Sequence, residues 1–302
     1  MSTPSPTPND TTPHKLTVAA VQLNTQQDVE HNLATIKSAI AAASAQGVKL
    51  VVLPENCCSM GRQFPTAERF DDLSEVLAGY AREFEVYLLA GTLPCFYRPD
   101  GTAVPNGRLR QVSLLFSPEG KMVARYDKIH LFTATVADKH GNYDEAATFE
   151  PGTQTVVAPI EVDNVVYQLG MMVCFDLRFP ALAQRLRQAG ADILSAPSAF
   201  TYLTGQAHWS LLLQARALDS QCMVIGAAQG GEHHYKNGKT RETWGHTAIT
   251  DFNGSMVDSY DNSALQGAAA DNDYALVFAT LDKEAQQQGR QKMPIFDCHR
   301  LA

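Results

Sequence analysis

The feature that most constrains the fold of this 302-residue chain is the alternation of short apolar segments with longer segments of helical periodicity. Residues 16–23 and 50–53 are apolar and rich in β-branched side chains, which is typical of buried strands. Residues 29–45, between them, carry apolar side chains at helical spacing. Residues 66–85 then predict a second helix and residues 86–91 a third strand. This order of elements predicts an α/β chain.

The second half of the chain repeats the alternation. Turn residues at 117–120 and at Asn253-Gly254 each predict an antiparallel hairpin between flanking strands. No linker rich in Gly, Ser or Pro separates the halves, so we expect one domain over residues 15–302. The other expected elements of this half are strands at 165–173, 193–196, 223–228 and 274–281, and helices at 180–188 and 208–218.

Three polar segments show no clear periodicity. Residues 1–14 are rich in Ser, Thr and Pro and predict a disordered N-terminal tail. Residues 133–153 predict a long loop, and loops of that length are often functional. Residues 231–242 predict a second, mobile loop. It contains His233-His234, which we interpret as part of an exposed loop because no cysteine or carboxylate accompanies them at metal-ligand spacing.

Composition excludes several classes of function. The net charge is −8, so the chain as a whole does not attract nucleic acid or anionic lipid. No apolar run approaches the ~18 residues needed to cross a bilayer, and the N-terminus has no features of a secretory signal. The six cysteines contain no CxxC pair. We therefore expect reduced thiols in a cytoplasmic protein, with no structural metal.

Three reactive residues follow predicted strands. Glu55, Lys128 and Cys174 each lie at or just beyond the end of an apolar run, where ligands gather in parallel α/β sheets. A carboxylate can take the thiol proton, and an ammonium can stabilise nearby negative charge. Taken singly, each also has a structural interpretation: a cap or surface acid, an ion pair with Asp127, and an inert core thiol.

The segments around these residues resemble the nitrilase superfamily of carbon–nitrogen hydrolases. The matching segments are residues 53–55 (LPE), 126–132 (YDKIHLF) and 173–180 (VCFDLRFP), in the family's order. The resemblance extends over about residues 16–297. It implies a single-domain, four-layer α-β-β-α sandwich and a Glu-Lys-Cys triad that needs no metal or organic cofactor.

The resemblance also implies a role for each residue. Glu55 corresponds to the general base, Lys128 to the lysine and Cys174 to the nucleophile. Glu145 is the best match for an acid that supports the lysine, with Glu150 as a less favoured alternative. An oxyanion would be stabilised by the Lys128 ammonium and the backbone N–H of Phe175.

Further segments are similar to the Nit branch of the superfamily. Within that branch, Gln221-Cys222, residues 227–229 and His233-His234 resemble the deaminated glutathione amidases. Hydrolysis of deaminated glutathione to 2-oxoglutarate and cysteinylglycine, a metabolite-repair reaction, is therefore implied. The segments that carry the branch likeness are residues 197–200 (PSAF), 205–209 (GQAHW), 214–218 (QARAL), 221–229 (QCMVIGAAQ) and 245–247 (GHT).

The implied substrate carries an α-keto carboxylate, which requires a cation in the pocket. Arg178 is the candidate, because a guanidinium can hold a carboxylate through two hydrogen bonds. Its structural alternative is an ion pair with Asp176. Phe200 and Thr201 are expected to line the same site, and Thr204 is a weaker candidate.

Two other functions remain open at this point. The chain could be an ω-amidase acting on α-ketoglutaramate or another short-chain amide, or a non-catalytic scaffold that has kept the fold. The triad argues against a scaffold, which has no need of a nucleophile and a base. The resemblance also implies a homodimer or a larger homo-oligomer.

Overall fold

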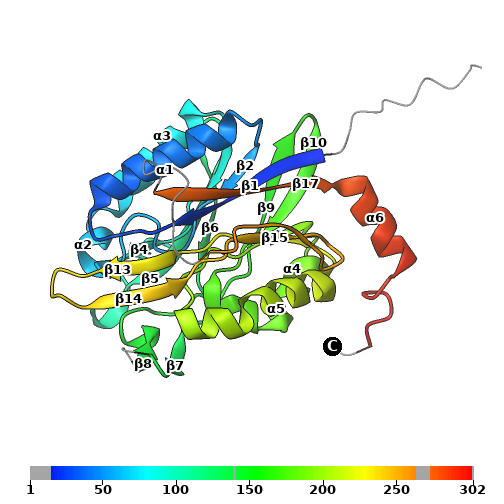
Figure 1. Ribbon diagram of the computed structural model, residues 1–302. Coiled ribbons are helices and arrows are strands. Elements are labelled where there is room, and N and C mark those ends of the chain that lie inside the picture. Colours follow the sequence, from blue (N-terminus) through cyan, green and yellow to red (C-terminus); the bar gives the residue numbers. More distant parts are fainter. Residues whose placement is uncertain (1–14, 139–140, 263–272, 301–302) are drawn as a thin grey trace, which may run out of the picture.

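The computed structural model describes residues 15–138, 141–262 and 273–300. They form an α-β-β-α sandwich, in which helices cover the outer faces of two sheets that pack against each other (Figure 1). The fold class predicted from the sequence is confirmed. The predicted tail at 1–14 lies outside the described residues.

The first sheet has seven strands in the order β17-β1-β2-β3-β5-β4, with β6 paired to β5. Strands β1, β2 and β3 are parallel, and the other pairs are antiparallel. Helices α1 (Val29–Ser44) and α3 (Phe70–Glu83) cover its outer face (Figure 1). The strands are β1 (Lys15–Leu23), β2 (Leu50–Val52), β3 (Tyr87–Leu89), β4 (Leu93–Cys95), β5 (Arg110–Phe116), β6 (Met122–Asp127) and β17 (Tyr274–Asp282).

The second sheet has six strands in the order β16-β15-β12-β11-β10-β9. Helices α4 (Pro180–Gln188) and α5 (Tyr202–Ser220) cover its outer face, and α6 (Lys283–Lys292) follows β17 at one end of the molecule (Figure 1). The strands are β9 (Val157–Val162), β10 (Val165–Gly170), β11 (Ile193–Ser195), β12 (Met223–Gly226), β15 (Ala248–Thr250) and β16 (Met256–Ser259).

Central strands such as β1, β2 and β11 are buried on both faces, which explains why their sequences are almost continuously apolar. In β1, Val18 and Ala20 pack into the core between the sheets. Ala19 and Val21, on the opposite face, pack into the core beneath α1 and α3. A third core lies beneath α4 and α5, around Trp209.

The structure gives two of the predicted helices other bounds than the sequence predicts. The single helix expected at 66–85 is wrong, because α2 (Gln63–Ala67) ends before α3 begins at Phe70. Asp71 and Asp72 occupy the first turn of α3, where the helix dipole favours negative charge. Helix α5 begins at Tyr202, before the expected start at His208. Gly205 weakens the helical pattern there. Packing nevertheless requires glycine at this position, because a Cβ would overlap the side chain of Trp244.

Both segments expected as long loops contain strands, so those predictions are wrong. Residues 133–153 contain β7 (Thr133–Thr135), β8 (Asn142–Asp144) and a 3-10 turn at Glu145–Ala147. Residues 231–242 fall in a hairpin formed by β13 (Gly230–His234) and β14 (Thr240–Trp244). Both hairpins lie at the same end of the molecule (Figure 1). They are polar because neither belongs to the two main sheets.

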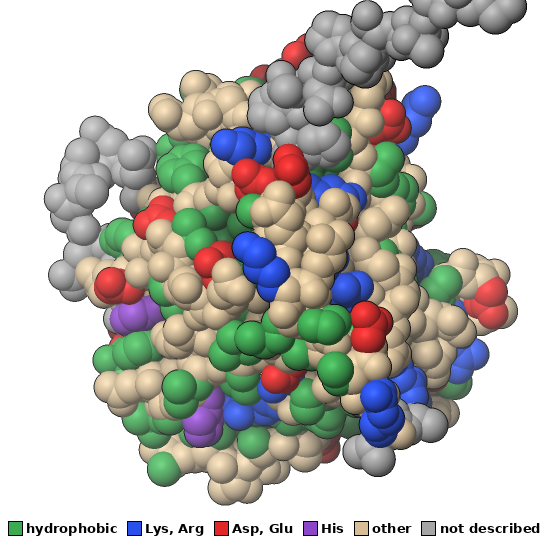
Figure 2. Space-filling view, turned by 90° about the vertical axis from the view of Figure 1, so that its right-hand side faces the viewer, with side chains coloured by type: hydrophobic (Ala, Val, Ile, Leu, Met, Phe, Trp, Pro, Cys, Tyr) green, Lys and Arg blue, Asp and Glu red, His purple; other side chains and the backbone are tan. Residues whose placement is uncertain are grey.

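Surface charges of both signs are interspersed on the face that carries α6 (Figure 2). That pattern differs from the single-sign patch typical of a nucleic-acid surface. In the described part of the chain, no helix is long and apolar enough to cross a membrane.

His233 attaches the β13–β14 hairpin to the rest of the fold. Its side chain is fully buried, so the expectation of an exposed loop is wrong for this residue. Its Nδ1 lies 2.7 Å from Thr25 O and its Nε2 lies 2.7 Å from Thr243 Oγ1. Because a carbonyl oxygen can only accept, Nδ1 donates to Thr25. Burial lowers the pKa of His233, so the ring is neutral at pH 7 and Nε2 accepts from the Thr243 hydroxyl.

Burial lowers the pKa of His233 from 6.5 to about 4. The unfolded chain then binds more protons than the folded chain between these pH values, so stability should fall as pH falls from 6.5 to about 4. The loss should approach about 3 kcal/mol in the free energy of unfolding, measured by urea denaturation at each pH.

Replacement His233→Asn should remove this part of the pH dependence, whereas His234→Asn should keep it, because His234 is exposed on the same strand. Equal pH dependence in the native protein and in His233→Asn would contradict the assignment.

Candidate functional site

The site forms where the ends of the two sheets meet. Glu55 follows β2 and Lys128 follows β6 in the first sheet, and Cys174 follows β10 in the second. All three side chains are buried, with exposures of 2%, 1% and 7% respectively. Residues that are far apart in the sequence are thus brought together in a water-poor environment.

The backbone turns sharply at Cys174. Strand β10 ends at Gly170, so the strand expected to continue to Val173 is wrong, and Cys174 begins a 3-10 helix, Cys174–Arg178. Its φ is 50°, in the left-handed region that few non-glycine residues adopt. Strained backbone of this kind is concentrated at functional sites, where the surrounding structure must enforce it.

Asp176 provides much of that enforcement. Its carboxylate is fully buried and accepts hydrogen bonds from Val173 N (2.9 Å) and the Tyr126 hydroxyl (2.7 Å). The backbone N–H of His130 donates to it over 3.1 Å, and the His130 ring lies 2.7 Å away at Nδ1. Asp176 therefore connects the turn at Cys174 to the segment that carries Lys128.

Lys128 lies between two carboxylates. Its Nζ is 2.8 Å from Glu55 Oε1 and 2.8 Å from Glu145 Oε2. Glu145 follows β8, and its Oε2 also accepts from Phe132 N at 2.6 Å. The alternative acid, Glu150, instead pairs with the arginines Arg98, Arg108 and Arg110.

These charges determine the protonation states at the site. Burial alone would lower the pKa of Lys128, but Glu145 and Glu55 outweigh it and hold that pKa well above its ordinary value. Burial and the nearby Glu55 charge raise the pKa of the Cys174 thiol, with Lys128 and the Ala199 N–H opposing them. The resting site therefore combines an ammonium with a neutral thiol, and the thiol needs a base to react.

The backbone of Ala199 affects both Glu55 and Cys174. Its N–H donates to Glu55 Oε2 at 3.0 Å, and it opposes the rise in the pKa of the Cys174 thiol. Glu55 therefore has one oxygen on Lys128 and the other on Ala199, which fixes the plane of its carboxylate. Sequence reasoning missed Ala199, because a backbone donor has no side-chain signature.

Two glycines allow close backbone contacts beside the site. A Cβ at Gly91 would overlap Pro54 O, and a Cβ at Gly152 would overlap Asp127 O. Pro54 and Asp127 directly precede Glu55 and Lys128, so the glycines let neighbouring chains hold both residues closely.

Arg178 lies beside Cys174 but does not pair with Asp176, so that structural alternative is wrong. Its guanidinium lies over the rings of Phe175 (5.9 Å) and Phe200 (5.5 Å). Both terminal nitrogens lie 3.3 Å from His208 Nδ1. His208 therefore holds the guanidinium as an acceptor, a contact that the sequence did not predict.

The remaining predicted residues lie at the start of α5. Thr201 is buried and shares a hydrogen bond of 2.8 Å with Thr204 through their hydroxyls. This pairing gives both residues a local structural role. The backbone N–H of Phe175 falls in the first turn of the 3-10 helix, where N–H groups lack intrahelical acceptors.

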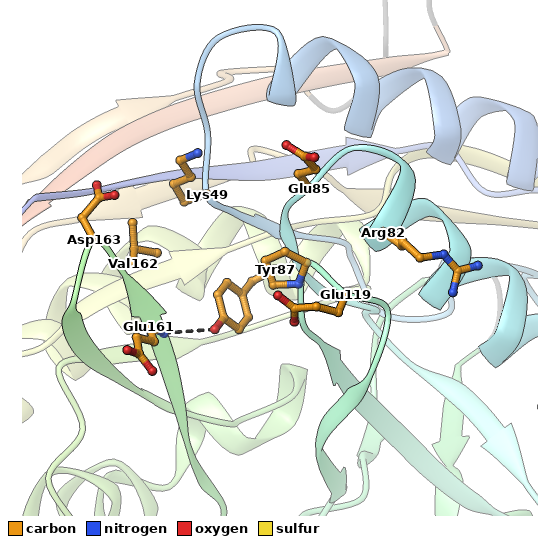
Figure 3. A pocket seen from close by; sticks show the side chains of 9 residues that line it. Lys49, Arg82, Glu85, Tyr87, Glu119, Glu161, Val162 and Asp163 are labelled. Carbon is orange, nitrogen blue, oxygen red and sulfur yellow. Dashed lines mark hydrogen bonds between the residues drawn. The ribbon is translucent and has the colours of Figure 1, made fainter.

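A separate cavity of about 600 Å³ lies at the other end of the first sheet (Figure 3). Lys49 precedes β2 and Tyr87 begins β3, so these residues lie at the strand ends opposite to Glu55. The cavity mixes Lys49 and Arg82 with several carboxylates and includes none of the predicted site residues.

Comparison with known proteins assigns the family. The profile of the carbon–nitrogen hydrolase family matches residues 17–291. A Yersinia enterocolitica protein named deaminated glutathione amidase is 40% identical over 80% of this chain and 81% of its own length. A Synechocystis protein of the same name is 35% identical over 91% of this chain and 95% of its own.

A solved structure agrees with this assignment. Saccharomyces cerevisiae Nit3, described as a member of branch 10 of the nitrilase superfamily, superposes with a TM-score of 0.71 at 27% identity. The match covers 93% of this chain and 95% of Nit3. The chain therefore belongs to the carbon–nitrogen hydrolase family, as a hydrolase of carbon–nitrogen bonds other than peptide bonds.

Proposed function

We propose that the chain is a cysteine-dependent amidase in which Cys174 is the nucleophile, Glu55 the general base and Lys128 the oxyanion donor. The observation that carries the proposal is the buried Lys128 ammonium, 2.8 Å from both Glu55 and Glu145. A scaffold would have no reason to bury two charges and partly bury a third beside a thiol, since burying charge is costly.

The first half of the reaction forms a thioester. Glu55 takes the Cys174 proton as the sulfur attacks the amide carbonyl carbon. The carbonyl oxygen becomes an oxyanion, stabilised by the Lys128 ammonium and the Phe175 N–H. The carbon–nitrogen bond then breaks, and the departing amine receives the proton from Glu55.

The second half releases the acid. Water gives a proton to Glu55 as it attacks the thioester carbon, and the carbon–sulfur bond breaks. The sulfur regains that proton, so the neutral thiol returns. Glu145 keeps Lys128 charged and in position throughout, because its carboxylate contacts the ammonium with both oxygens at 2.8 and 3.0 Å.

The proposed substrate is deaminated glutathione, hydrolysed to 2-oxoglutarate and cysteinylglycine as metabolite repair. The names of the Yersinia and Synechocystis relatives support this choice. Arg178 would bind the α-keto carboxylate, with Phe200, Thr201 and Thr204 around it. Support for this role comes from the guanidinium between two aromatic rings, held by His208.

We further propose a cytoplasmic homodimer or larger homo-oligomer. All six cysteines are free thiols, as in proteins of reducing compartments. Helix α5 exposes Leu203, Leu211 and Leu218 at helical spacing, with exposures of 41%, 67% and 55%. Such an apolar stripe is typical of a surface that is covered by a second subunit.

Hydrolysis of deaminated glutathione and of α-ketoglutaramate should be measured side by side. We expect a higher kcat/KM on deaminated glutathione and a loss of ~10⁴-fold or more in kcat for Cys174→Ala. A preference for α-ketoglutaramate would keep the mechanism but make the chain an ω-amidase. Full activity of Cys174→Ala would contradict the mechanism.

Replacement Arg178→Lys tests the carboxylate contact. Lysine keeps the charge but loses the paired donors, so kcat/KM for keto-acid amides should fall about 10- to 100-fold, mainly through KM. An uncharged short-chain amide is the control and should be affected much less. If Arg178→Lys and the native protein hydrolyse keto-acid amides with equal kinetics, Arg178 does not belong to the pocket.

A further inference from the structure

The β13–β14 hairpin carries a side chain that reaches the centre of the site. The Nη2 atom of Arg241, in β14, donates to Ala199 O at 2.7 Å. The same guanidinium lies over the ring of Tyr143, in β8, with 5.7 Å between its central carbon and the ring centroid. Arg241 therefore connects the segment before α5 that carries Ala199 with strand β8.

The segment with Ala199 orients Glu55, and the strand with Tyr143 helps to orient Glu145. These are the two carboxylates that bind Lys128. On one side, the Ala199 N–H donates to Glu55 Oε2 at 3.0 Å. On the other side, Tyr143 packs against Phe132, with ring centroids 5.3 Å apart. The Phe132 N–H in turn donates to Glu145 Oε2 at 2.6 Å.

The hairpin is anchored firmly enough to act as a support. Thr243 forms a bridge with Thr201, and Trp244 N donates to Phe200 O at 3.1 Å. Gly205 allows Trp244 to lie directly against α5. The buried His233 attaches the other strand to Thr25. Arg241 thus extends from a base that is fixed at several points.

We propose that Arg241 is a positioning residue for the reaction, which holds Ala199 so that its N–H stays on Glu55. The inference rests on the proposed function of Glu55 and Cys174. It gives a role to a hairpin that lies outside both main sheets. An arginine suits this role, because one planar group can donate to a carbonyl and stack on an aromatic ring at the same time.

The test compares Arg241→Ala, Arg241→Lys and the control Lys239→Ala, which removes a cation from the same hairpin. In Arg241→Ala, kcat should fall about 10- to 100-fold, because small displacements of reacting groups are costly, with KM nearly unchanged. The acid limb of kcat/KM should move to higher pH, since a carboxylate that loses a donor is protonated more easily.

Arg241→Lys should recover part of kcat, because an ammonium can still donate to Ala199 O. Lys239→Ala should match the native protein. A second measurement is the rate at which iodoacetamide alkylates Cys174, followed by peptide mapping, which should fall in Arg241→Ala. This rate needs no substrate, so it separates failure of the inference from a wrong choice of substrate.

Two results would overturn the inference. In the first, Arg241→Ala loses activity only in proportion to the fraction of protein that is folded. Its activity divided by the amount of Cys174 that can be alkylated then equals the native value, and its pH profile does not move. Arg241 would then be merely structural. In the second, KM rises for carboxylate-bearing amides while kcat and the pH profile stay native, which would make Arg241 a substrate-binding residue.

Discussion

The rest of the site depends on the two ion pairs of the buried Lys128 ammonium. An unpaired charge in such a place would cost several kcal/mol, so the fold must supply partners for it. Glu55 and Glu145 supply them at 2.8 Å each. This requirement fixes the end of β2, the end of β6 and the turn after β8 relative to one another. Neither carboxylate can move without leaving charge unmatched.

The same pairing explains how a thiol can react in this environment. Burial and the neighbouring carboxylate keep Cys174 protonated at rest, because they raise the pKa of its thiol. Glu55 binds Lys128 with one oxygen and Ala199 with the other, so the orientation of its carboxylate is fixed. In the proposed mechanism, the Lys128 ammonium then stabilises the oxyanion.

The sequence predicted the elements whose physics is local. Strands such as β1 were predictable because both faces are buried, and the hairpin at Asn253-Gly254 because its turn residues are distinctive. The fold class followed from motifs around Glu55, Lys128 and Cys174, which spacing alone could not have brought together. The resemblance to a family supplied that step.

The errors have a common cause in tertiary contacts. The start of α5 was missed because Gly205 is required by Trp244, which lies far away in the sequence. The polar sequence of the β13–β14 hairpin predicts a loop, because nothing local indicates that His233 is buried against Thr25. Hydrogen bonds from backbone atoms, such as the one from Ala199 N to Glu55, do not depend on residue type, so no sequence pattern predicts them.

The most direct test of the account is to look for the covalent intermediate. Native protein mixed with deaminated glutathione, quenched in acid within its first turnovers and digested, should carry a 2-oxoglutaryl group on the peptide that contains Cys174. The same adduct should form from α-ketoglutaramate, because both amides share that acyl group. Turnover without any adduct on Cys174, or with the adduct on another residue, would contradict the account.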